Sequence, residues 1–170
     1  DVKMTDLLYL CNDHLKYGLS CEETYLKIEK RLLQIRDDLG LSNNIEGRLQ
    51  KFKNELVPGL SLDYLVSRGE YLTAILRAEY LGYPFVDAKD LICFNDDGSI
   101  NYERINRKFR KISEKYDHFV VPGFYGAYDN DEIMVMSRGG SDVTGSIIAN
   151  ITNCNLYENW TDVSGILMAD

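Results

Sequence analysis

The stretch His118-Phe-Val-Val-Pro-Gly-Phe-Tyr-Gly126 decides the fold class of this chain. Its continuous apolar run is typical of a strand that is buried on both faces of a parallel sheet. Pro122 and Gly123 end the run, because both residues favour turns. A polar helical pattern over 102–115 comes directly before it, so a helix leads into a buried strand. This order predicts an α/β protein with a mostly parallel, covered sheet.

Downstream of this stretch, the pattern predicts a hairpin, a helix and a further strand. Residues 124–127 and 133–136 are short apolar runs on either side of the turn sequence Tyr128-Asp-Asn-Asp131, which indicates the hairpin. A helix of small residues that ends near Asn153 follows, and a strand over 156–160 comes after it. Strands and helices therefore alternate along this half of the chain.

Upstream, the chain begins with four helical patterns. Thr5 is expected to cap the first helix, and Ser20-Cys-Glu-Glu23 forms a capping box at the start of the second. The third helix covers 45–57, and the fourth covers 61–82. The pattern changes to sheet at the short apolar run Tyr83-Pro-Phe-Val-Asp87.

The composition is that of one soluble globular domain. The chain has 170 residues, of which 45% are hydrophobic and 27% are charged, so it can bury a core. Nineteen basic residues against 27 acidic ones give a net charge of −8, which argues against nucleic acid as a partner. No apolar run approaches the ~20 residues that span a bilayer, and no secretion signal is present. We therefore expect a cytoplasmic protein without membrane contact.

The cysteines and histidines predict no metal site. The four cysteines are widely dispersed, whereas a metal site or a redox motif needs close pairs such as C-x-x-C. Neither of the two histidines lies beside another metal-binding side chain at the required spacing. We expect reduced thiols, no zinc site and no His-dependent catalytic triad.

Ser137-Arg-Gly-Gly-Ser-Asp142 lies between an expected strand and an expected helix. Free backbone N–H groups and the helix dipole favour an anion at such a position, and glycines allow a close approach. Arg138 adds a planar fork that suits a carboxylate or a phosphate, and Asp142 begins the helix. The alternative is a tight turn with a capping aspartate, and the loop by itself identifies no ligand.

Ser67-Arg-Gly-Glu70 lies inside the fourth expected helix. A glycine there costs about 1 kcal/mol relative to alanine, which indicates that another group packs close to Gly69. Glu70 would then face a cleft as the partner of a cation. The alternative is an exposed Glu70 that pairs with a lysine or arginine on the surface.

Tyr157-Glu-Asn-Trp-Thr-Asp162 places polar side chains at the end of an expected strand. Open α/β sheets bind ligands at this edge, so a nucleotide base or ribose would fit there. The alternative is a strand end with a buried Trp160 and a turn that begins at an aspartate.

Four motifs, taken in order and at these separations, resemble the catalytic domain of aspartokinases, which are members of the amino acid kinase family. They are Ser67-Arg-Gly-Glu70, Val121-Pro-Gly-Phe-Tyr-Gly126, Ser137-Arg-Gly-Gly-Ser-Asp142 and Trp160-Thr-Asp-Val-Ser-Gly165. The resemblance implies a three-layer αβα sandwich with a mostly parallel central sheet, the carbamate kinase-like fold, here incomplete. It also implies transfer of the γ-phosphoryl group of ATP, bound with Mg²⁺, to the side-chain carboxylate of L-aspartate. The product, 4-phosphoaspartate, leads to lysine, threonine and methionine.

The resemblance also assigns residues to the aspartate site. Arg138 would bind the α-carboxylate of the substrate, and Glu70 would bind its amino group. Phe124 and Ser141 would line the same pocket, and Thr5 would also touch aspartate. A cationic fork and an acidic partner suit the two ends of a zwitterion, as the residues by themselves suggest.

For the transfer site, the resemblance implies that Asp142 fixes a lysine, and that Trp160, Thr161 and Asp162 border the nucleotide. That lysine belongs to a glycine-rich loop, Lys-Phe-Gly-Gly-Ser-like, which would precede Asp1. In the family, nucleotide contacts and regulatory ACT domains follow the position of Asp170. We therefore expect residues 1–170 to be part of a catalytic domain from a homo-oligomeric parent enzyme. By themselves they would bind ligands weakly and show no turnover, because no lysine neutralises the phosphates.

Two other functions remain open at this point. One is a kinase of the same fold that acts on glutamate, carbamate or UMP. Glu70 together with Arg138 favours an amino acid, because UMP would place a phosphate beside a carboxylate of like charge. The other is a non-catalytic binding or regulatory module that keeps the fold.

Overall fold

The computed structural model describes residues 2–42, 44–137 and 139–160. Within these ranges the chain forms helices first, and a hairpin of two short strands then lies between two later helices. The elements are α1 (Met4–Lys16), α2 (Glu22–Asp38), α3 (Ile45–Glu55), α4 (Leu62–Leu81), the 3-10 helix η1 (Ala88–Asp90), α5 (Tyr102–Ser113), β1 (Tyr125–Ala127), β2 (Ile133–Val135) and α6 (Gly140–Thr152).

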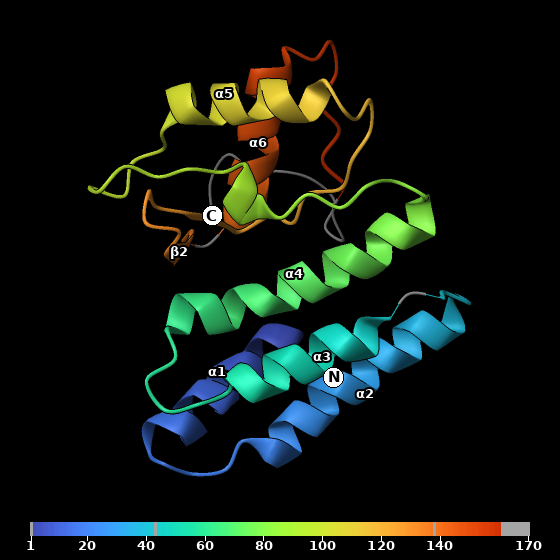
Figure 1. Ribbon diagram of the computed structural model, residues 1–170, viewed down its shortest axis with the longest axis vertical. Coiled ribbons are helices and arrows are strands. Elements are labelled where there is room, and N and C mark those ends of the chain that lie inside the picture. The colour runs from blue at the N-terminus through green and yellow to red at the C-terminus, as the bar shows by residue number, and fades with distance from the viewer. Residues whose placement is uncertain (1, 43, 138, 161–170) are drawn as a thin grey trace, which may run out of the picture.

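Helix α4 runs between two layers of the molecule (Figure 1). Helices α1, α2 and α3 pack on one side of it, and the strands lie on the other side, with α5 and α6 beyond them. Each side has its own hydrophobic core. The helical core is built on Leu8, Tyr25, Leu32, Leu49 and Leu65, all fully buried. The second core is built on Leu91, Ile92, Cys93, Ile105 and Tyr125, which are also fully buried.

The fourth helix has the bounds that its sequence predicts. The Ser61 hydroxyl accepts a hydrogen bond from the Tyr64 N–H at 3.4 Å, which satisfies one of the free donors at the helix start. Gly82 ends the helix in the left-handed conformation with φ +69°, a conformation that glycine adopts without strain. The predictions for α3, α5 and α6 are confirmed to within two residues at each end.

The expected caps of the first two helices are wrong. The cap residue of α1 is Lys3, whose N–H donates to the Asp6 carboxylate at 3.2 Å, so Thr5 lies inside the first turn. The cap residue of α2 is Cys21, and the Ser20 hydroxyl instead accepts from the Glu22 N–H at 3.2 Å. The cap of α1 lies two residues before the expected position and that of α2 one residue after it, because a neighbouring side chain satisfies a free N–H group at each helix start.

The described strands are short and pair in two directions. β1 and β2 form the expected antiparallel hairpin, with Tyr125 opposite Val135. Single parallel bridges join Phe85 to Val120 and Cys93 to Ala127. The α/β class is therefore confirmed, with helices on both sides of a small sheet.

The predicted strand over 156–160 is wrong. The segment makes no backbone pairing within the described part of the chain, and the side chains of Leu156 and Trp160 are 72% and 88% exposed. Its apolar alternation is typical of a strand, but a strand forms only where a neighbouring strand can accept its hydrogen bonds.

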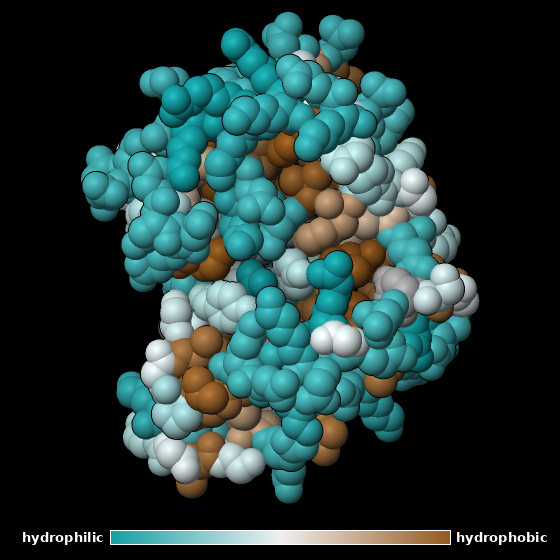
Figure 2. Space-filling model, in the orientation of Figure 1, coloured by the Kyte–Doolittle hydropathy of each residue, from teal (hydrophilic) through white to brown (hydrophobic). Residues whose placement is uncertain are grey.

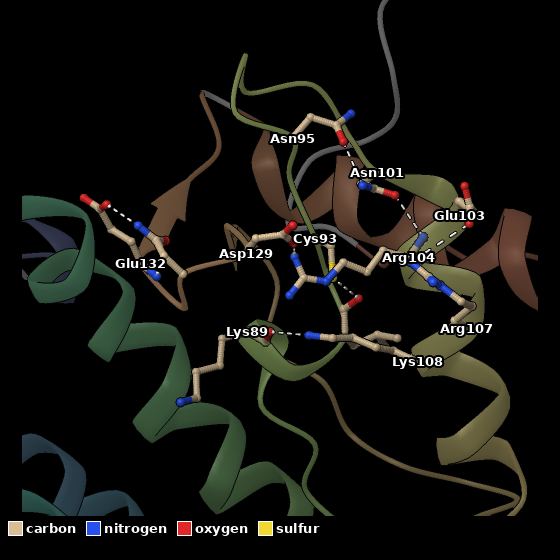
Figure 3. A network of polar contacts seen from close by, with 12 residues as sticks. Lys89, Cys93, Asn95, Asn101, Glu103, Arg104, Arg107, Lys108, Asp129 and Glu132 are labelled. Atoms are coloured by element: carbon tan, nitrogen blue, oxygen red, sulfur yellow. Dashed lines mark hydrogen bonds and ion pairs between the residues drawn. The ribbon is translucent and has the colours of Figure 1, made fainter.

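Helix α5 is joined to the strand layer by polar contacts (Figure 3). The Asn101 side chain accepts from the Arg104 N–H at 2.9 Å and caps the helix. The Arg104 guanidinium forms an ion pair with Asp129, and the Lys108 ammonium donates to the Lys89 carbonyl at 3.2 Å. In Figure 2 the surface over α5 is mostly hydrophilic, whereas hydrophobic side chains are visible nearer the middle of the molecule. The charged helix thus covers the second core.

Candidate functional site

A pocket of about 300 Å³ lies where the first turn of α1, the middle of α4 and the start of α6 meet. We call it the central pocket. Its walls come from both layers of the molecule, because α1 and α4 belong to the helical core and the other segments to the strand layer. Its lining residues are Met4, Thr5, Val66, Gly69, Glu70, Thr73, Phe124, Ser137, Gly139, Gly140 and Ser141.

On the helical side, Gly69 brings α1 against α4. A Cβ atom at Gly69 would lie 3.0 Å from Cδ1 of Leu8 and 3.2 Å from Cγ of Met4. The prediction that another group packs close to this glycine is confirmed. This close packing places the first turn of α1, with Thr5, beside Glu70 at the central pocket. Glu70 is half-buried there, and no lysine or arginine among the described residues forms an ion pair with it.

On the strand side, Phe124 has an unusual backbone conformation. Its φ of +80° lies in the left-handed region, which a bulky residue rarely adopts. The Phe124 N–H donates to the Thr144 hydroxyl at 3.1 Å, and its carbonyl accepts from the Met136 N–H at 2.7 Å. These two bonds hold Phe124 in its strained conformation. Strained residues of this kind cluster at functional sites, and Phe124 lies in the wall of the central pocket.

The start of α6 closes the pocket. A Cβ atom at Gly140 would lie 2.7 Å from Cβ of Met136 and 3.1 Å from the Phe124 ring, so this position requires glycine. Gly139 has φ +80° and precedes the first helical residue. The Gly140 N–H donates to the Ser137 carbonyl at 3.0 Å, so the first turn of α6 begins at the pocket wall, where the positive end of the helix dipole favours an anion.

The structure brings together four of the residues predicted to bind the substrate. Thr5, Glu70, Phe124 and Ser141 all line the central pocket. Arg138 lies outside the described residues, between two residues in sequence that line the same pocket.

The residues predicted for the transfer site do not line the central pocket where they are described. Asp142 is exposed in the first turn of α6, and one of its carboxylate oxygens accepts from the Asn159 side chain at 3.1 Å. Trp160 is 88% exposed, which also contradicts the alternative of a buried Trp160. Thr161 and Asp162 lie outside the described residues.

Sequence reasoning missed part of the pocket wall. Thr73 follows Glu70 by three residues on α4, and this helical spacing would have identified it as a neighbour on the same face. Val66 and Met4 gave no such signal, because apolar residues on a helix are predicted simply to be core.

Two general features of the described residues bear on function. Among residues 2–42, 44–137 and 139–160, no group of His, Cys, Asp and Glu side chains is arranged to hold a metal ion. No helix within the same ranges combines the length and the apolar character that crossing a bilayer requires. The four cysteines are free thiols, and Cys154 is the exposed one.

The family model of the amino acid kinases matches residues 6–170. The chain belongs to the amino acid kinase family. Aspartokinase 3 of Bacillus subtilis is 30% identical over 98% of this chain and 40% of its own length. The amino acid kinase fold predicted by the four motifs is thus confirmed.

Solved structures agree with this amino acid kinase assignment. A crystal structure of the aspartate kinase of Clostridium acetobutylicum matches all of this chain and 39% of its own, with a TM-score of 0.92 and 44% identity. Escherichia coli aspartokinase III, in complex with aspartate and ADP, matches 98% of this chain and 42% of its own with a TM-score of 0.80. Its 22% identity shows the shared fold alone. The chain spans about two fifths of the length of these relatives.

Proposed function

We propose that this chain forms the aspartate-binding part of an aspartate kinase. The whole protein would transfer the γ-phosphoryl group of ATP to the side-chain carboxylate of L-aspartate. The observation that carries the proposal is the central pocket, which gathers Thr5, Glu70, Phe124 and Ser141 from separate segments of the chain. The similarity to two named aspartate kinases, at 30% and 44% identity, supports the same substrate.

The chemistry of the pocket suits an amino acid zwitterion. The Glu70 carboxylate would bind the ammonium group, and Arg138 would bind the α-carboxylate with its planar fork. Hydroxyls of Thr5 and Ser141 supply further hydrogen bonds, and the Phe124 ring closes one wall. A carboxylate at Glu70 disfavours UMP, whose phosphate would meet a like charge.

ATP would meet the substrate at the start of α6. Among the described residues, a Cβ atom at Gly139 would have only the Asp142 carboxylate within 4.0 Å, which would leave room for a phosphate group at this backbone. Asp142 would fix the phosphate-binding lysine, and Trp160, Thr161 and Asp162 would border the nucleotide. Mg²⁺ would be bound with the ATP and neutralise part of its charge.

The proposal extends to the setting of the whole protein. It would be a cytoplasmic homo-oligomer on the route to lysine, threonine and methionine. Residues 1–170 would be part of its catalytic domain, with the lysine loop before Asp1 and regulatory ACT domains after Asp170.

The Glu70→Gln variant of the 170-residue chain tests the substrate assignment. It keeps the shape of the side chain and removes the charge, so L-aspartate binding should weaken by about 1.5–3 kcal/mol, the value of a hydrogen bond to a charged group. Nuclear magnetic resonance titration measures this, because it detects the weak binding expected of the chain by itself. The matched control is Glu103→Gln, at an exposed carboxylate of α5.

Two results would contradict the proposal. One is a wild-type chain whose resonances do not move at millimolar L-aspartate. The other is a Glu70→Gln variant that keeps its affinity for aspartate and loses its affinity for ATP, which would place Glu70 in the nucleotide site.

A further inference from the structure

Arg68 is buried on α4 within a cage of tyrosine rings. Its side chain is 6% exposed, and its guanidinium carbon lies 4.4 Å from the ring centre of Tyr64, 4.5 Å from that of Tyr71 and 5.5 Å from that of Tyr125. Its Nε and Nη2 atoms donate to the Ser67 hydroxyl at 3.2 and 3.0 Å. Among the described residues it forms no ion pair with a carboxylate. We call Arg68 and the three tyrosines the Arg68 cage.

The hydroxyl groups of the cage connect it to two other segments, α3 and the residue before η1. The Tyr125 hydroxyl donates to the Asp87 carboxylate at 2.7 Å, next to η1. The Tyr64 hydroxyl donates to the Glu55 carboxylate at the end of α3. The Tyr71 hydroxyl accepts from the Arg48 guanidinium at 2.6 Å. The positive charge of Arg68 is thus balanced through tyrosines by carboxylates that it does not itself touch.

The cage spans the boundary between the two cores. Tyr71 packs against both cores, Arg68 is on α4, and Tyr125 belongs to β1. A guanidinium is costly to bury, and an apolar side chain would fill the same space at less cost. Unlike an apolar side chain, the planar guanidinium and the three rings prefer particular relative orientations. The cage therefore fixes how α4 is turned relative to β1.

Both elements joined by the cage also supply walls of the central pocket. Glu70 follows Arg68 by two residues, which places it about 200° further around α4, on the side that faces the pocket. Phe124 directly precedes Tyr125 and is held at φ +80°. A small rotation of α4 against β1 would therefore change the distance between Glu70 and Phe124.

We propose that Arg68 is a positioning residue, whose cage sets the spacing of Glu70 and Phe124 across the central pocket. This inference rests on the proposed function, because the spacing matters for an aspartate bound between them. The cavity of about 540 Å³ beside the cage does not favour an anion, because four carboxylates outnumber its three cationic side chains. Its charged lining residues are Glu55, Asp87, Asp131 and Glu132 with Lys51, Arg68 and Lys89.

The test compares Arg68→Met and Arg68→Lys in the 170-residue chain with Arg107→Met. Arg107 is exposed on α5 and serves as the matched control. The first measurement needs no ligand. It follows the methyl resonances of threonines in the chain, of which Thr5 and Thr73 line the pocket and Thr144 holds Phe124, whereas Thr24 lies in the helical core. The second measurement is the dissociation constant for L-aspartate, at a temperature well below thermal unfolding.

We expect Arg68→Met to shift the resonances of Thr5, Thr73 and Thr144, to leave Thr24 unchanged, and to weaken aspartate binding at least about tenfold. Arg68→Lys keeps the charge over the rings and should recover part of the affinity, and Arg107→Met should behave as wild type. A role in stability alone would lower the unfolding temperature and leave the dissociation constant unchanged.

The two measurements separate the two proposals. If the wild-type chain does not bind aspartate, the proposed function fails, and the ligand-free resonances still test the positioning role. A folded Arg68→Met variant with unshifted pocket threonines, or with wild-type affinity for aspartate, overturns the inference. If Arg68→Met does not fold, Arg68→Lys and Tyr125→Phe carry the same test. We expect smaller shifts of the same threonine resonances in these variants, and unshifted resonances would contradict the positioning role.

Discussion

The helical half of the molecule, residues 2–81, and the α/β half, residues 83–160, bury similar apolar cores by different means. In the helical half, α1 to α4 form their own backbone hydrogen bonds and need each other only for packing. In the α/β half, β1 and β2 have three residues each, and Phe85, Cys93, Val120 and Ala127 are joined by single parallel bridges.

The difference shows where this protein depends on long-range contacts. A helix completes its hydrogen bonding within one segment, whereas a strand completes it only through residues distant in sequence. The α/β half therefore relies on α4, which packs against β2, to hold its strands in place. We expect the helical half to keep its structure when the α/β half opens, whereas opening of the helical half should also open the α/β half.

The largest expected effect is that of Leu65→Ala compared with Leu91→Ala. Both leucines are fully buried, one in each core, so each truncation should cost about 2–5 kcal/mol of the unfolding free energy. Native-state hydrogen exchange should show lost protection in both halves for Leu65→Ala, because α4 supports both. For Leu91→Ala, amides of α1 to α3 should stay protected, and their exposure would show that the halves unfold as one unit.

The next effect compares two glycines. A Cβ atom at Gly126 would lie 2.6 Å from the carbonyl oxygen of Ile92, a backbone atom that cannot move aside, so Gly126→Ala should destabilise by about 1–3 kcal/mol. At Gly69 the nearest atoms belong to the flexible side chains of Leu8 and Met4, and alanine favours the helix, so Gly69→Ala should cost less. Chemical denaturation measures both, and a larger loss for Gly69→Ala would contradict the comparison.

Thiol labelling compares the two cores directly. Cys11 in the helical core and Cys93 in the α/β core are both fully buried, so each reacts only when its core opens. Burial and the neighbouring Cys21 also raise the pKa of Cys11 to about 12, which keeps its thiol protonated in the folded state. Mass spectrometry should find the exposed Cys154 modified first and Cys93 modified roughly tenfold faster than Cys11. Equal rates for Cys11 and Cys93 would mean that the cores open together.

The smallest expected effect is alkaline destabilisation through buried tyrosines. Burial, with the nearby Asp87, raises the pKa of Tyr125, and burial with the Glu55 contact raises that of Tyr64 to about 12. A group whose pKa is higher in the folded state holds its proton there, so stability is complete below the unfolded tyrosine pKa, about 10, and falls as the pH rises above it. In the Tyr125→Phe variant, the unfolding free energy should fall less steeply with pH, by up to about 1.4 kcal/mol per pH unit. Urea denaturation from about pH 9 to about pH 11, on both sides of the pKa of free tyrosine, measures how the unfolding free energy changes with pH. Equal slopes for Tyr125→Phe and the wild type would falsify the account.

The sequence by itself determined the helices and much of the pocket. The periods of α3, α4 and α5, the cap at Ser61 and the left-handed Gly82 depend on contacts within a few residues, so local patterns predict them. Gly69 predicted a closely packed neighbour, because a glycine inside a helix lowers the stability of the helix and therefore needs a packing reason. Four of the five substrate residues suggested by the motifs lie together in the central pocket, whereas their roles there stay predictions.

Only the tertiary structure decided which apolar runs became strands and what surrounds each charged group. The run over 156–160 has the pattern of a strand and pairs with no described residue, because pairing requires a partner that no local pattern encodes. Arg68 is a charged residue that sequence reasoning left unassigned within its motif, yet it is buried among the rings of Tyr64, Tyr71 and Tyr125. Tyr125 lies 57 positions further along the chain than Arg68, and only the packing of the β1–β2 hairpin against α4, through β2, brings the two together.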